Sequence, residues 1–127
     1  MAVSKYAAKI DPWSLDQWAQ SNESVATGVT ANAGGGQTNA TLLTGTMNDV
    51  ATVATAADSV KLPLGQVGLW VLVRNSAANS MQVFGSGTDT INAAATATGV
   101  AQAATTSALY FCTTAAPAAK WFRVLSA

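Results

Sequence analysis

Four consecutive segments between Asp49 and Asn92 read Asp58-Ser-Val-Lys-Leu-Pro63, Gly68-Leu-Trp-Val-Leu-Val-Arg-Asn75, Asn79-Ser-Met-Gln-Val-Phe84 and Gly87-Thr-Asp-Thr-Ile-Asn92. Runs of valine, threonine and aromatic residues between Gly, Pro, Asn and Asp are typical of short β-strands. The stretch Val67–Arg74 is apolar at odd and even positions alike except at its end, so both faces of a strand there would be apolar. We therefore predict that it is a central strand and the most buried element. The asparagines of Asn75–Ser80 predict a hairpin turn that pairs Met81–Phe84 back onto that strand.

The same pattern extends over residues 24–127. Thr41–Thr55 predicts one kinked strand or two short ones, and residues 93–106 predict a short strand and a loop. Apolar residues alternate along Ser107–Thr113 and Lys120–Ser126, which predicts two further strands. Short strands separated by turns every ~8–12 residues indicate an all-β fold, an antiparallel β-sandwich or a jelly-roll-like barrel.

Residues 1–23 differ from the rest and predict an N-terminal extended or helical docking arm. They hold five of the twelve charged residues and two of the four tryptophans. Asp11 followed by Pro12 is typical of a helix start, and Ile10 is placed to pack on Leu15. Such a helix puts Leu15 and Trp18 on one face. Because so short a helix is marginal in water, we expect it to need a binding surface.

Charge is scarce in this chain. Charged residues make up 9% of the sequence, and the six basic and six acidic side chains cancel. Nucleic-acid binding needs a basic surface that releases counterions from phosphates, so this composition argues against a nucleic-acid partner. No apolar leader and no run long enough to span a membrane is seen, so we expect synthesis in a cytoplasm and no membrane partner.

Residues for catalysis or metal binding are few. The chain has no histidine and a single cysteine, Cys112, which we expect to be a small core residue. Asp49, Asp58 and Asp89 lack the spacing of a calcium loop, and aspartate is common at turns for its own backbone hydrogen bonds. Gly34–Gly36 has no phosphate-loop lysine after it and predicts a turn. We therefore predict no catalytic site, no metal site, no cofactor and no enzymatic activity.

Three aromatic residues, Trp70, Tyr110 and Trp121, lie on predicted strands and suit two roles. Packing in the core is favoured, because Trp70 sits in the most apolar strand and Trp121 alternates as a strand residue does. A groove that stacks sugars is the alternative. Trp13 and Trp18 lie instead among polar neighbours, where large aromatics are typical of interface hot spots.

Within Asp49–Asn92, a Leu-Pro bend, a long apolar strand, an Asn-rich turn and a Gly/Asp turn follow one another. This order of strands and turns resembles a domain of tailed-phage structural proteins, particularly capsid decoration or cement proteins. The resemblance implies a virion protein on the capsid exterior, made in the bacterial cytoplasm. It also implies binding to the assembled major capsid protein and a homotrimer. On the arm, the helix pattern and the aromatic side chains predict Ile10, Trp13, Leu15 and Trp18 as the capsid-docking residues. The alternative is a head-fibre or tail-fibre module that binds host-surface carbohydrate.

Overall fold

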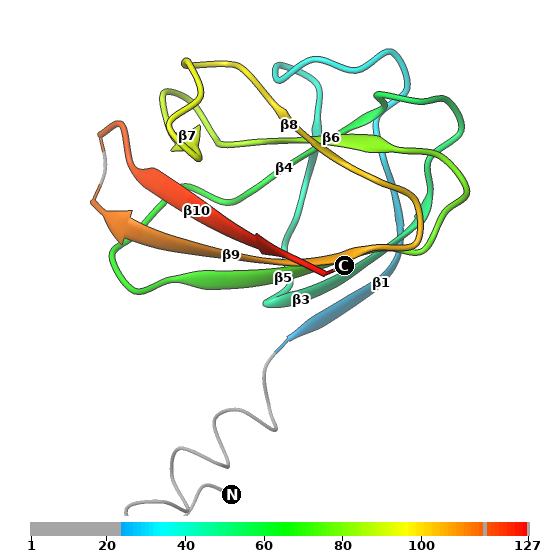
Figure 1. Cartoon of the computed structure of the whole chain (residues 1–127), viewed down its shortest axis with the longest axis horizontal. Coiled ribbons are helices and arrows are strands. Elements are labelled where there is room, and N and C mark those ends of the chain that lie inside the picture. Colours follow the sequence, from blue (N-terminus) through cyan, green and yellow to red (C-terminus); the bar gives the residue numbers. More distant parts are fainter. Residues whose placement is uncertain (1–23, 116, 127) are drawn as a thin grey trace, which may run out of the picture.

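A computed structural model describes residues 24–115 and 117–126, and within these ranges the chain forms strands and no helix. The predicted all-β class is confirmed. The strands form two stacked sheets (Figure 1). Their bounds are β1 Val25–Thr30, β2 Thr41–Leu42, β3 Met47–Thr52, β4 Ser59–Lys61, β5 Trp70–Asn75, β6 Met81–Phe84, β7 Thr90–Ile91, β8 Val100–Gln102, β9 Ser107–Thr114 and β10 Lys120–Leu125.

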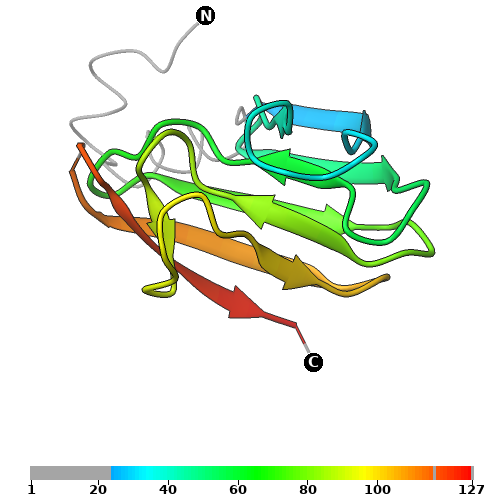
Figure 2. The same ribbon diagram turned by 90° about the horizontal axis from the view of Figure 1, so that it is seen from above.

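Consecutive strands alternate between the two sheets as far as β9. The six-stranded sheet has the order β1-β3-β5-β9-β10-β7, and the four-stranded sheet has the order β2-β4-β6-β8. Seen from above, β1 and β10 lie toward opposite sides of the molecule (Figure 2). The chain visits the other sheet between each of the pairs β1–β3, β3–β5, β2–β4 and β4–β6, which are parallel. It also visits the other sheet between β6 and β8, but this pair is antiparallel.

The prediction of an antiparallel arrangement is therefore wrong for much of the molecule. Only β5–β9, β9–β10 and β6–β8 pair antiparallel among the described residues, and the sheets are mixed. The predicted hairpin at Asn75–Ser80 is also wrong, since β5 and β6 belong to different sheets. Asn75 is buried, and its Nδ2 donates to the Asn79 carbonyl 2.9 Å away, so the turn is held as a connection between layers.

Other local predictions hold. Thr41–Thr55 contains two short strands, and residues 93–106 contain the short strand β8 between loops. Cys112 is a buried free thiol, as expected. The docking arm predicted over residues 1–23 lies outside the described residues.

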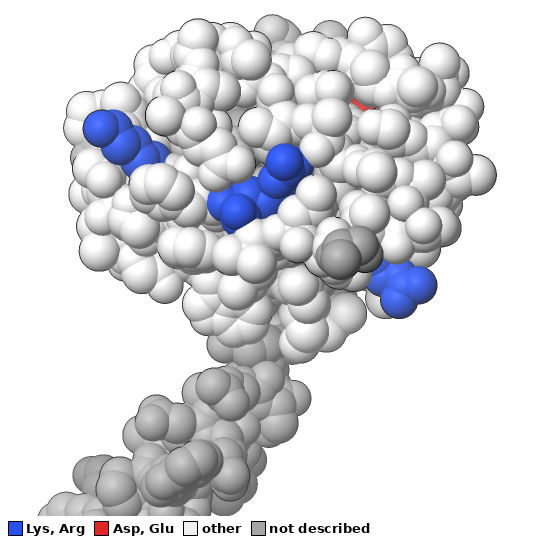
Figure 3. Space-filling view, viewed as in Figure 1, with Lys and Arg blue, Asp and Glu red and all other residues white. Residues whose placement is uncertain are grey.

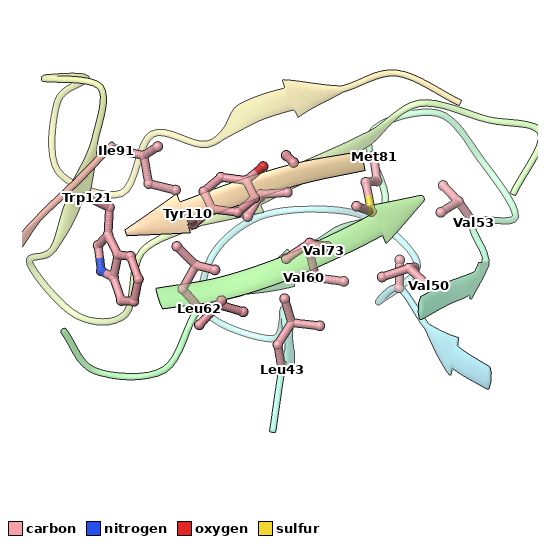
Figure 4. Packing of buried hydrophobic residues seen from close by; sticks show 14 of the residues in the cluster. Leu43, Val50, Val53, Val60, Leu62, Val73, Met81, Ile91, Tyr110 and Trp121 are labelled. Carbon is pink, nitrogen blue, oxygen red and sulfur yellow. The ribbon is translucent and has the colours of Figure 1, made fainter. Parts of the chain in front are cut away.

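The core lies between the sheets, where alternate side chains of each strand meet (Figure 4). The six-stranded sheet supplies Val50, Val71, Val73, Tyr110 and Trp121, and the largest of these, Trp121, is 1% exposed. The four-stranded sheet and its connections supply Leu43, Val60, Leu62, Met81 and Val83. Two faces of small and branched side chains interdigitate in this way, as in other two-layered β domains.

The side-chain amide of Gln102 in β8 is one of the polar groups that join the two sheets. Its Nε2 donates to the Val73 carbonyl in β5 at 2.9 Å, and its Oε1 accepts from the Tyr110 hydroxyl in β9 at 2.9 Å. Gln102 and Tyr110 are each fully buried. Burial raises the pKa of the Tyr110 hydroxyl to about 12, against smaller opposing effects of Arg123. The hydroxyl is therefore held protonated, as a donor to Gln102.

Tyr110→Phe tests this contact through the pH dependence of stability. The unfolded hydroxyl loses its proton near pH 10.0 and the folded one near 12. The contribution of the neutral hydroxyl to the free energy of unfolding is therefore fully present below pH 10. It falls by roughly 1.4 kcal/mol per pH unit as the pH rises from 10 toward 12. We expect chemical denaturation to show this extra loss only in the wild type, and Tyr110→Phe to cost about 1–2 kcal/mol at neutral pH. Equal pH slopes for the two proteins would contradict the assignment.

Candidate protein-binding surface

The buried aspartates stabilise turns. Both carboxylate oxygens of Asp58 accept backbone N–H groups, from Gly34 at 3.3 Å and from Thr55 at 3.0 Å. Asp89 accepts in the same way from Gly65 at 2.8 Å and Ala119 at 2.9 Å. The predicted local turn role is confirmed for Asp58 through its bond from Thr55 and is wrong for Asp89, whose two donors lie 24 and 30 residues away along the chain. Within residues 24–115 and 117–126, no three His, Cys, Asp or Glu side chains lie close enough to hold a metal ion together.

A cavity of about 530 Å³ lies beside the glycine turn, lined by Gly34, Gly35, Asp58 and Phe84 among others. Gly35 has φ +70°, and a Cβ there would lie 2.8 Å from the Ala57 carbonyl oxygen, so the turn needs glycine at that position. Because the Gly34 amide is bonded to Asp58, this donor is already used within the protein. The arrangement explains the loop and brings no catalytic pair together.

The outward side of the six-stranded sheet carries a row of apolar side chains across five strands. The register aligns Val25 of β1, Met47 of β3, Leu72 of β5, Leu109 of β9 and Val124 of β10, in that order. At the ends of the row, Val25 is 60% exposed and Val124 is 58% exposed. Large apolar residues therefore face outward over most of the width of the sheet.

A second outward row consists of Trp70, Phe111 and Phe122, which the register aligns across β5, β9 and β10. The rings of Phe111 and Phe122 stack with centroids 6.1 Å apart. Trp70 is 37% exposed and Phe122 is 43% exposed. We call these two rows together the apolar sheet face. It corrects two predictions, because Trp70 is not a core residue and Val67–Arg74 is buried only at alternate positions after Leu69.

An apolar groove of about 340 Å³ lies at the end of this surface. Leu42, Pro63, Leu69 and Trp70 line it, together with the segment from Leu43 to Thr46. Thr46 in the groove lining contacts Ser24, the first described residue: the Thr46 amide donates a hydrogen bond to the Ser24 carbonyl at 3.0 Å. Residues 1–23 therefore join the domain next to the groove. Leu64 and Val67, 59% and 65% exposed, follow Pro63 along the chain and add apolar surface there.

Charged side chains are few on the described part of the chain. The face in Figure 3 shows a few separate Lys and Arg side chains and almost no acidic surface. Two of the three aspartates of the described chain, Asp58 and Asp89, are 2% exposed, which explains why so little acidic surface is seen. Asp49 and Arg74 are register partners beside the apolar sheet face, and Asp49 accepts from the Ser76 hydroxyl at 2.6 Å. The contacts that this surface offers are therefore mainly apolar.

The predicted docking residues Ile10, Trp13, Leu15 and Trp18 lie outside the described residues. The reasoning from sequence missed the apolar sheet face. Its signal was present in β5, β9 and β10, where apolar residues occupy both parities. We had interpreted this pattern in β5 as a strand buried on both sides within the domain.

Comparison with protein-family models, curated proteins and solved structures finds no match to this chain. In the part of the chain that the structure describes, no helix is long and apolar enough to cross a membrane.

Two adjacent residues of β10 test the orientation of the sheet. Trp121 is in the core and Phe122 is on the apolar sheet face. We expect Trp121→Ala to lower the free energy of unfolding by about 3–5 kcal/mol. Phe122→Ala should cost about 1 kcal/mol, since it loses mainly the ring pair with Phe111. Urea unfolding in dilute solution measures both, and a larger loss for Phe122→Ala would show that the strand faces the other way.

Proposed function

We propose that this chain is a structural virion protein that decorates and cements a phage capsid by binding the assembled lattice of the major capsid protein. The observation that carries the proposal is the apolar groove at Leu42 and Trp70, beside Ser24, where residues 1–23 join the domain. Exposed apolar surface of this kind marks a site of protein interaction. The groove and the segment with Trp13 and Trp18 then form one attachment region on the exterior of the shell.

The low charge of the chain supports a protein partner over a nucleic acid. Its six basic and six acidic residues cancel. Apolar burial supplies the attachment, and the arm adds aromatic side chains of the type that dominate binding energy in interfaces. A lattice repeats its binding sites, so linked copies would bind with an effective concentration far above that of free chains. Such a protein stabilises the assembled shell by preferring it over free subunits.

The fibre alternative, a module that binds host carbohydrate, has support from one residue. Trp70 is partly exposed and lines the groove, where an aromatic ring could stack on a sugar. The other two aromatic residues considered for this role, Tyr110 and Trp121, are buried. The remaining groove lining is mainly aliphatic, whereas a sugar site also needs hydrogen-bonding groups that fix its hydroxyls. The decoration role therefore has the better support.

Binding to purified shells that lack this chain tests the attachment region. We expect Trp13→Ala or Trp18→Ala to weaken cosedimentation by about 2 kcal/mol or more, or roughly thirtyfold. Leu42→Thr should also weaken it, because Leu42 is 49% exposed in the groove. Thr88→Ala, in an exposed turn of the domain, is the matched control and should bind as the wild type does. Unchanged binding by all three attachment variants would refute this site.

The cementing role predicts a difference between decorated and stripped particles. Stripped shells should release DNA or disassemble at a lower temperature than decorated shells, and adding the protein back should restore the difference. Thermal release measured with a DNA-binding dye gives this comparison, and the Leu42→Thr protein should restore it less well. Equal melting of the two particles together with altered host adsorption would favour the carbohydrate alternative.

A further inference from the structure

We infer that copies of this chain associate through the apolar sheet face, and that another copy of the chain covers this surface. The inference deepens the proposed function by naming the contact that would build an oligomer on the shell. The contact itself involves no shell protein. It can therefore be tested in solution, and it can fail while shell binding is retained.

The first argument is that three adjacent strands are apolar on both sides. In β5, β9 and β10 the inward residues Val71, Tyr110 and Trp121 are buried, while their outward neighbours Leu72, Phe111 and Phe122 are also large and apolar. A sheet whose strands are apolar at both parities is normally covered on both faces. The four-stranded sheet covers one face. The other face is left for a second polypeptide.

The second argument concerns area. The accessible surface of the chain is 6973 Å². A standard protein interface takes about 800 Å² from each partner, or about a tenth of the surface of a small protein. The apolar sheet face holds eight large apolar side chains from five of the six strands, so a contact there spans most of the width of the sheet. Trp70 and Phe122 supply the aromatic anchors that such contacts use.

The third argument is that the surface is compatible with itself. The chain has a formal net charge of zero, so copies meet without a large electrostatic barrier. Beside the apolar rows, Asp49 and Arg74 are register partners of opposite sign. No ion pair joins them in the described part of the chain, and Arg74 is exposed. A cation and an anion at the same border allow Arg74 of one copy to meet Asp49 of the next.

The competing occupants are residues 1–23 and the shell surface itself. Both predict a monomer in solution, whereas the inference predicts a particle with two or three times the 12.8 kDa mass of one chain. Light scattering after gel filtration and sedimentation velocity on the full chain, over a wide range of concentration, distinguish these cases. A monomer at every concentration overturns the inference.

Substitutions on the face test where the contact lies. Phe122→Thr combined with Val124→Thr should raise the dissociation constant of the oligomer at least tenfold, because hot-spot side chains are lost. The control is Thr88→Ala, in an exposed turn outside the groove and the sheet face, which should leave the mass unchanged. Val25→Glu, at the opposite end of the row, provides a second variant if the double variant unfolds. Circular dichroism verifies the fold of each.

The outcomes separate this inference from the proposed function. An oligomer that persists in both face variants, or that Thr88→Ala dissociates equally, overturns the sheet-face contact. A face variant that becomes monomeric and still binds shells through the groove supports it. Loss of shell binding without any change in mass shows that the face contacts the shell, and it also overturns the inference.

Discussion

The hydrogen bonds of the Gln102 amide hold the two sheets in register. Gln102 lies in β8, at the edge of the four-stranded sheet, and bonds to the Val73 carbonyl and the Tyr110 hydroxyl of the six-stranded sheet. A buried amide left without partners costs more than a typical hydrogen bond contributes, so this contact disfavours other placements of β8. Apolar residues alone would permit the two layers to slide. The amide specifies one arrangement, together with the Asn75 and Arg123 side chains that donate to carbonyls of β8.

The order in which the chain visits the two sheets determines how the strands are connected. Because strands β1 to β8 alternate between sheets, every connection among them passes from one layer to the other. These connections need anchors, and the buried carboxylates of Asp58 and Asp89 supply them by accepting backbone N–H groups. The acidic groups are thereby used inside the domain. What remains outside is poor in charge and rich in apolar side chains.

The apolar sheet face and the groove beside Ser24 give this small domain two adjoining surfaces for other proteins. The groove adjoins the point where residues 1–23 enter, and Trp70 belongs both to its lining and to the second outward row of the sheet. A decoration protein needs both kinds of contact, one toward the lattice and one toward its own copies. In our proposal the groove and arm serve the first and the sheet face serves the second.

Local patterns in the sequence determined the all-β class, the short strands, the β8 strand and loop, and the bond of Asp58 to its own turn at Thr55, because these depend on neighbouring residues. The bonds of Asp89 join distant segments and were decided by the tertiary structure. Strand partners depend on contacts between distant segments. Parallel pairing and the separation of β5 from β6 were therefore decided only by the tertiary structure. The same holds for Trp70 and Phe122. Alternation shows that neighbours face opposite sides of a sheet, but which side has a second layer over it depends on the packing of the whole chain.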